Sequence, residues 1–122
     1  MRCCIESVSY FYVLYCQDGS LYGGYTTDLE RRESEHNQGV GAKYTKPQTR
    51  RPVKMIYAEG YYSGSEATKA EYAFKKQTRK NKLIYLTNQG ITFPIESTNP
   101  CLINMEQMNI KEGEKNAESK EF

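Results

Sequence analysis

Three groups of residues along this chain are of the types that could bind a phosphate group. The first is Tyr10-Phe11-Tyr12 and the second is Tyr22-Gly23-Gly24. Arg32 follows Gly24 by eight residues, and His36 lies one helical turn beyond it. Phenols at strand ends, a glycine pair and an arginine/histidine helix face suit contact with phosphate oxygens better than they suit a hydrophobic core. The spacing therefore predicts a phosphate-binding site.

The two tyrosine groups fall on a predicted hairpin. Residues 9–16 are rich in aromatic and β-branched side chains, which is typical of a strand. Asp18-Gly19 supplies a bend, and residues 21–25 return as a second strand.

A helix is predicted next, because Thr27 and Glu30 form a capping box, and it ends at residue 35 or 36. Leu29 is the only apolar residue on the stripe that holds Arg32, Glu33 and His36. Such a polar stripe indicates a face that meets a ligand or a partner.

The second half of the domain repeats strand and helix signals. A strand is predicted over 51–59, a helix from Ser63 to about residue 77, with Glu66 completing its capping box, and a short helix over 79–86 after Thr78. The predicted fold class is α/β (α+β): a small three-stranded antiparallel sheet flanked by helices, in the order β-β-α-β-α-α.

Charge divides the chain into a domain and a tail. Residues 1–87 carry 14 Lys/Arg against 9 Asp/Glu, whereas residues 88–122 carry 3 against 6. We expect a flexible leader over 1–8, one domain over 9–87 and a mostly disordered acidic tail over 88–122, within which residues 91–95 could add an edge strand. A basic domain attracts polyanions such as nucleic acids, although the excess is mild.

The cysteines and the lengths of the apolar runs indicate the cellular compartment of the protein. Cys3, Cys4, Cys16 and Cys101 form no Cys-x-x-Cys pair, which favours reduced thiols in a cytoplasmic protein. No apolar run reaches the ~18 residues of a membrane-spanning helix, so no membrane partner is expected. The sequence does not indicate the oligomeric state.

The predicted elements and the tyrosine groups together resemble the GIY-YIG nuclease superfamily, in particular its small stand-alone bacterial branch. The resemblance covers roughly residues 9–86. It is carried by the run from Asp18 to Arg32 and by Glu35-His36-Asn37, Gly41-Ala42-Lys43-Tyr44-Thr45, Arg51-Pro52-Val53 and Ser65-Glu66-Ala67. The chain departs from the superfamily pattern at Tyr10, where the first motif has its glycine, and at Tyr25, where some members have lysine.

The resemblance implies a DNA phosphodiesterase that uses one divalent cation, Mg²⁺ or Mn²⁺. By position, Tyr12 and Tyr22 would be the motif tyrosines, Arg32 and His36 the helical site residues, and Glu71 the metal ligand. A single carboxylate suits Mg²⁺, which keeps several waters. Which tyrosine acts as the base stays open, as does the position of a late asparagine, for which Asn81 is the nearest candidate.

Each of these residues also has a structural interpretation. Glu71 could be a solvated helix residue, although Ala67, Ala70 and Phe74 on its stripe argue that it faces inward. Arg32 could pair with Asp28 or Glu35, and His36 could interact with the helix dipole. Gly24 could let the backbone approach a nucleic acid, or it could mark a bulge.

Two basic segments are candidate DNA contacts. The first contains Lys43, Lys46, Arg50, Arg51 and Lys54, and the second contains Lys75 and Lys76 and continues through Arg79, Lys80 and Lys82. Either could instead be a solvated face.

The leading functional hypothesis is a structure-selective, metal-dependent endonuclease whose partner is branched or single-stranded DNA, with RNA left open. The alternatives are an inactive nucleic-acid-binding domain or an accessory subunit of a repair or recombination complex. A further hypothesis is that the acidic tail folds over the basic face.

Overall fold

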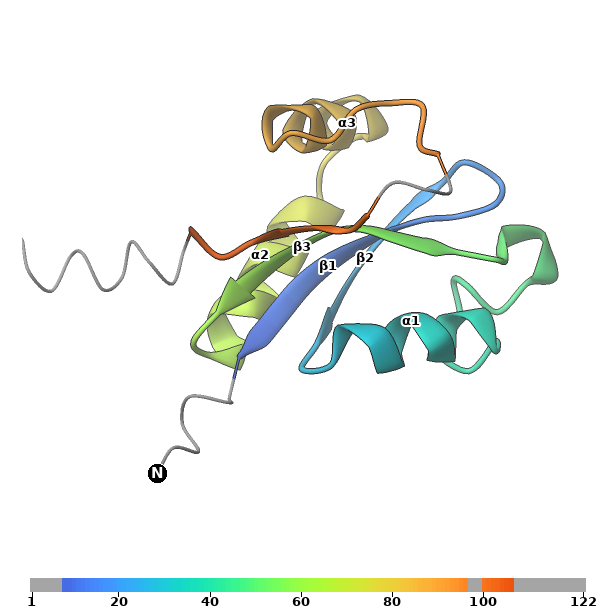
Figure 1. Ribbon diagram of the computed structural model, residues 1–122, viewed down its shortest axis with the longest axis horizontal. Coiled ribbons are helices and arrows are strands. Elements are labelled where there is room, and N and C mark those ends of the chain that lie inside the picture. Colours follow the sequence, from blue (N-terminus) through green and yellow to red (C-terminus); the bar gives the residue numbers. More distant parts are fainter. Residues whose placement is uncertain (1–7, 97–99, 107–122) are drawn as a thin grey trace, which may run out of the picture.

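A computed structural model describes residues 8–96 and 100–106. Its elements run β1 (Ser9–Tyr15), β2 (Leu21–Thr26), α1 (Leu29–Asn37), a 3₁₀ turn (Gln48–Arg50), β3 (Lys54–Tyr61), α2 (Gly64–Lys75), α3 (Arg79–Asn88) and β4 (Leu102–Asn104). One mixed sheet carries the helices, with α1 and α3 on opposite sides of it (Figure 1). The predicted fold class is confirmed. No helix in the described part of the chain is long and apolar enough to cross a membrane.

The sheet has four strands, so the prediction of three was wrong by one. The strand order is β2-β1-β3-β4, with β1 antiparallel to both neighbours and β4 parallel to β3. β4 has only three residues and a largely exposed pattern, so it leaves no alternating hydrophobic signal in the sequence.

Two hydrophobic clusters lie on the two faces of the sheet because successive strand residues point to opposite sides. Phe11 and Val13 join Phe74 of α2 and Leu86 of α3 on one face. The other face, on the α1 side, contains Tyr12, Leu14, Cys16, Val53, Met55 and Ala58. Tyr12 and Phe11 are therefore neighbours in sequence that serve different layers.

Helix α1 docks through polar side chains, which explains its weakly apolar stripe. Asn37 accepts a hydrogen bond from the Val53 N–H (2.6 Å) and donates one to the Val53 carbonyl (3.1 Å), as a neighbouring strand would. Glu33 accepts from the Met55 N–H (2.8 Å). These contacts satisfy backbone groups at the start of β3, where β4 does not reach.

Two of the three predicted helix starts are confirmed. Ser63 caps α2 by accepting from the Glu66 N–H, and Thr78 caps α3 by accepting from the Asn81 N–H. The cap of α1 is Asp28, not Thr27, because the Asp28 carboxylate accepts from the Arg31 N–H. Aspartate and threonine are both favourable caps, so sequence alone did not separate them.

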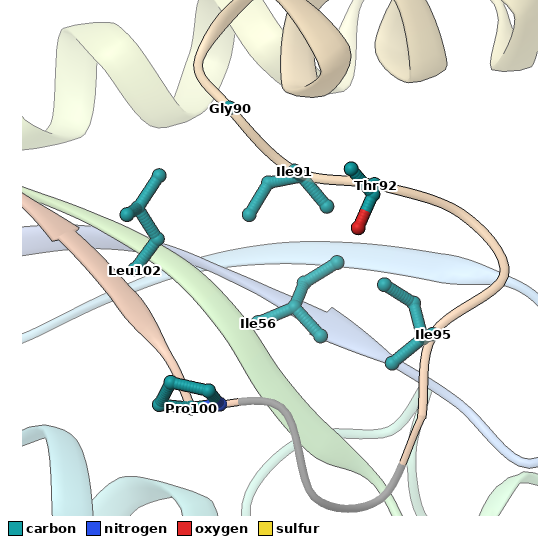
Figure 2. A pocket seen from close by; sticks show the side chains of 7 residues that line it. All are labelled: Ile56, Gly90, Ile91, Thr92, Ile95, Pro100 and Leu102. Atoms are coloured by element: carbon teal, nitrogen blue, oxygen red, sulfur yellow. The ribbon is translucent and has the colours of Figure 1, made fainter.

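Segments of the expected tail pack on the sheet. Ile91 is buried, and a cavity of about 130 Å³ lies among Ile56, Ile91, Ile95 and Leu102, whose side chains point toward a common space (Figure 2). The Asn104 amide donates to the Tyr57 hydroxyl at 3.1 Å. Residues 88–96 thus contribute the buried Ile91 to the core, and residues 100–106 contribute strand β4. Residues 1–7 of the expected leader, and 97–99 and 107–122 of the expected tail, lie outside the described residues.

Candidate functional site

The site is centred on the hydroxyl of Tyr12, in the middle of β1. Tyr12 is 1% exposed. Its hydroxyl oxygen lies 2.8 Å from Nε2 of His36 and accepts a hydrogen bond from Nε of Arg32 at 3.3 Å. Both partners come from α1, one helical turn apart. The helix thereby places a guanidinium and an imidazole over a strand phenol.

The contacts of Thr45 assign the ring proton of His36 to Nδ1. The Thr45 hydroxyl lies 2.7 Å from Nδ1 of His36 and within 3.3 Å of the Ala42 carbonyl, to which it donates. A hydroxyl has one hydrogen, so Thr45 must accept from Nδ1–H. Nε2 is then unprotonated and accepts from the Tyr12 hydroxyl. The result is a chain of hydrogen bonds in which each residue donates to the next. Arg32 donates to Tyr12, Tyr12 to His36, His36 to Thr45, and Thr45 to the Ala42 carbonyl.

The pKa values of this chain follow from its burial. The pKa of His36 is lowered to about 4, mainly by burial and in addition by the positive charge of Arg32, while Glu35 acts in the opposite direction. Burial raises the pKa of Tyr12 to about 12, although its contact with Arg32 acts the other way. Both groups are neutral near pH 7, which fits the hydrogen-bond directions above.

Arg32 is held in one place and keeps donors in reserve. Nη1 contacts Glu35 at 2.8 Å and Nη2 donates to the Gly41 carbonyl at 2.8 Å. A guanidinium has five N–H groups, so three are used here and one remains on each terminal nitrogen. Its side chain is 30% exposed. Arg32 therefore forms the ion pair with Glu35 and also contacts Tyr12.

Tyr22 forms the more open wall of the site. This half-buried residue on β2 places its ring 5.5 Å from the His36 ring, edge to face. The ring also stacks on Tyr44, with the centroids 5.4 Å apart and an angle of 17° between the planes. Nζ of Lys75 lies 5.0 Å from the Tyr22 centroid.

Glu71 reaches the site from α2. Its side chain is 21% exposed and pairs with Nζ of Lys75 at 3.0 Å. Lys75 in turn lies over the Tyr22 ring, which places Glu71 on the Tyr22 side of the site, and the negative charge of Glu71 is one of the smaller causes that raise the pKa of Tyr12. A carboxylate oxygen in a partly exposed position is a donor that Mg²⁺ or Mn²⁺ accepts, and the exposed Lys75 ammonium can move aside. The residues present therefore fit one cation with mostly water and phosphate ligands. No group of three or more His, Cys, Asp or Glu side chains that could hold a metal occurs among the described residues.

The glycines make this convergence possible. A Cβ built on Gly24 would lie 2.3 Å from the Tyr12 hydroxyl oxygen, and one on Gly41 would lie 2.7 Å from Nδ1 of His36. Side chains at these positions would collide with the hydrogen-bonded chain. This explains Gly24 by packing, while nucleic-acid contact at Gly24 stays a prediction.

The predicted basic contacts divide into two kinds. Lys43, Lys46, Lys75 and Lys76 are exposed. Arg50 instead donates to the Tyr44 carbonyl (2.8 Å) and pairs with Asp18 (3.2 Å), and Arg51 donates to the Lys46 carbonyl (2.8 Å). The two arginines hold segment 38–50 against the domain. Their contact with DNA stays a prediction, as does that of the four lysines.

Sequence reasoning missed three site residues in segment 38–50: Gly41, Tyr44 and Thr45. The signal was present, because all three stand in the run Gly41-Ala42-Lys43-Tyr44-Thr45 that carried part of the family resemblance. A lone threonine or glycine in a loop has no periodic pattern, so its role appears only when the loop is seen folded onto His36.

Comparisons with known proteins identify the family of this chain. A sequence model described as the GIY-YIG catalytic domain matches residues 8–84. A UPF0213 protein of Enterococcus faecalis is 68% identical over 77 residues, which cover 63% of this chain and 88% of that protein. One from Listeria innocua is 62% identical over 80 residues, covering 66% of this chain and 87% of that protein.

A solution NMR structure of an E. faecalis protein is 58% identical and covers 73% of this chain and 93% of that chain, with a TM-score of 0.49. The matched residues 8–84 run from the start of β1 into α3 and include every side chain of the hydrogen-bonded chain as well as Tyr22 and Glu71. With this match over more than half of its length, the chain belongs to the GIY-YIG family, beside the small stand-alone UPF0213 proteins.

Proposed function

We propose that this protein is an endonuclease that hydrolyses phosphodiester bonds in DNA with one divalent cation, Mg²⁺ or Mn²⁺, held by Glu71. The observation that carries the proposal is the convergence of Tyr12, Arg32 and His36 in one hydrogen-bonded chain beside Tyr22. Family membership supports nuclease chemistry in general. The free thiols of Cys16 and Cys101 fit the proposed cytoplasmic location.

Arg32 is the proposed phosphate clamp. Its two remaining N–H groups, one on each terminal nitrogen, match two oxygens of a phosphate. Because Tyr12, Glu35 and Gly41 already hold the guanidinium, little side-chain order is lost when phosphate binds. The clamp stabilises charge that grows on the phosphate oxygens in the transition state.

Tyr22 is the proposed general base. Tyr12 is closed off from solvent and already donates to His36, whereas Tyr22 is half-buried and can reach water. In its phenolate form, Tyr22 takes the proton of the attacking water and then releases it to solvent. Tyr12 and His36 act as positioning residues for Arg32. A divalent cation on Glu71 would supply Lewis-acid stabilisation of the phosphate and of the leaving oxygen.

The test is cleavage of a panel of labelled single-stranded, duplex, flap and junction DNAs with Mg²⁺ or Mn²⁺. We expect cleavage by the wild type, selectivity for the shape of the DNA rather than its sequence, and a loss of at least about a hundredfold in kcat for Glu71→Gln and Tyr22→Phe. Matched controls are Glu30→Gln and Tyr72→Phe, which alter exposed residues. Cleavage that is unchanged in Glu71→Gln would rule out the proposed site.

A second candidate is a nucleic-acid-binding protein that does not cut, alone or as an accessory subunit of a repair or recombination complex. The 3.0 Å pair between Lys75 and Glu71 favours it, because an ammonium there competes with a metal ion. Salt-dependent binding of DNA or RNA that survives Glu71→Gln, with no cleavage in any metal, would select this candidate.

A further inference from the structure

Two ammonium groups lie over aromatic rings at or beside β2, the edge strand of the sheet. Nζ of Lys75 is 5.0 Å from the ring of Tyr22. Nζ of Lys82 is 5.4 Å from the ring of Phe74, and that ring packs on Gly23, where a Cβ would lie 3.1 Å from Phe74 Cδ2. Lys82 comes from α3 and Lys75 from α2, so two helices bring these cations together.

Lys75 and Arg79 place positive charge near Lys82. Burial lowers the pKa of Lys82, and the positive charges of Lys75 and Arg79 lower it further. Among the described residues, Lys75 forms an ion pair with Glu71, whereas neither Arg79 nor Lys82 forms one. Glu71 offsets the charge of Lys75, but the positive charges of Arg79 and of the partly desolvated Lys82 have no such partner in the described part of the chain, and an anion bound there would stabilise them.

The neighbouring Lys76 does not share this arrangement. Its Nζ lies 5.1 Å from the ring of Tyr72, which is 66% exposed, so Lys76 points toward solvent on another side of α2. The cationic group therefore consists of Lys75, Arg79 and Lys82 and does not include every basic residue between 75 and 82. Its residues come from the end of α2 and from α3, and Lys75 lies over Tyr22, whose ring also faces His36 of α1.

We propose that Lys75, Arg79 and Lys82 form a binding site for a backbone phosphate of the nucleic-acid strand that passes the β2 edge next to Tyr22. This inference rests on the proposed function for its ligand. It names a contact on the α3 side of the sheet, whereas Lys43 and Lys46 lie in segment 38–50, which Arg32 ties to α1. A strand bound at both places crosses the site between them.

The test measures affinity for a labelled single-stranded DNA by fluorescence anisotropy, with EDTA present so that no cleavage occurs, over a series of NaCl concentrations. Lys82→Met keeps the apolar stem over Phe74 and removes the charge. One lost phosphate contact lowers the slope of log affinity against log salt by about 0.7, which is about fivefold weaker binding at 0.1 M salt. Lys82→Arg keeps the wild-type slope. Lys69→Met, an exposed lysine of α2, is the matched control, with a slope within about 0.2 of wild type.

Equal slopes of log affinity against log salt for Lys82→Met and Lys69→Met would overturn the proposed phosphate site, even if the wild type cleaves DNA. Absence of salt-dependent binding by the wild type would overturn it as well. A reduced slope in Lys82→Met together with no cleavage in any metal supports the cluster and counts against the catalytic proposal. The two proposals can thus fail separately, and thermal unfolding of each variant verifies that it is folded.

Discussion

The phenol of Tyr12 occupies the space that a side chain at residue 24 would need. Tyr12 and Gly24 are direct cross-strand partners on β1 and β2. A Cβ at residue 24 would lie 2.3 Å from the hydroxyl oxygen and 2.4 Å from Cζ of that ring. His36 and Arg32 hold the same hydroxyl from α1, so the ring has no free direction in which to retreat. Gly24 is thus part of how the site is assembled.

Gly24→Ala is expected to destabilise the protein by about 1–3 kcal/mol, because the new methyl group overpacks a buried ring. The free energy of unfolding from urea titration measures this loss. Tyr12→Val removes the ring, so adding Gly24→Ala to Tyr12→Val should cost much less than Gly24→Ala alone. Additive costs in this double-mutant cycle would contradict the steric explanation.

Thr45→Val is expected to release the tautomer of His36. The change keeps the shape but leaves the Nδ1–H of His36 without its acceptor, which costs about 1–3 kcal/mol for a buried donor. Because His36 is the only histidine of the chain, the nitrogen-15 spectrum of its ring reports the tautomer directly. Thr45→Ser should keep the Nδ1–H form. An unchanged spectrum in Thr45→Val would show that Thr45 does not select it.

Because His36 titrates, the stability of the protein should fall as the pH drops below 7. Its pKa is about 4 in the folded chain against 6.5 as the ordinary value, so between these values the unfolded chain binds more protons. The free energy of unfolding therefore rises with pH in this window. The contribution is fully present above about pH 6.5 and is lost as pH falls toward 4, by roughly 3 kcal/mol at most.

The measurement for this pH effect is urea unfolding at pH 7 and at pH 4.5, with His36→Gln as the reference that lacks the titrating group. The wild type should lose more stability than His36→Gln between the two pH values. A histidine ring resonance that titrates near pH 6.5 in the folded protein would contradict the burial argument.

Lys75→Met is expected to tighten the binding of Mn²⁺ to the free protein. Lys75 holds the Glu71 carboxylate at 3.0 Å, and a partly exposed ion pair contributes up to about 1 kcal/mol, so its removal should improve affinity about two- to fivefold. Glu71→Gln should abolish the binding. Water-proton relaxation follows Mn²⁺ without DNA or turnover. Equal affinity in Lys75→Met and wild type would mean that the metal and Lys75 do not compete for Glu71.

The helices and the first three strands could be predicted because each has a local signal. Ser63 and Thr78 are caps with helical residues behind them, and the hairpin has alternating aromatics around Asp18-Gly19. The placement of Arg32 and His36 one turn apart on α1 was likewise readable from spacing. Their convergence with Tyr12 followed only from the family resemblance, because sequence spacing does not say which strand a helix covers.

What could not be predicted depends on contacts between distant segments. Asn37 imitates a strand partner for Val53, and Thr45 orients His36, but neither residue has a pattern around it. Glu59 is a charged residue at 4% exposure, which hydropathy would place at the surface. It is buried because the hydroxyls of Tyr57, Tyr61 and Tyr85 donate to it, and these come from a strand and a later helix.

The same cluster leads to a prediction about where the folded domain ends. Tyr57 also accepts from the Asn104 amide, and β4 pairs with β3 through Tyr57, Ala58 and Glu59. A chain ending at residue 106 keeps these contacts and should unfold like the full chain. A chain ending at residue 99 loses the β4 pairing and the Asn104 hydrogen bonds, and should be less stable by about 2–4 kcal/mol. Urea unfolding of both chains measures the difference, and equal stability would show that the domain closes before β4.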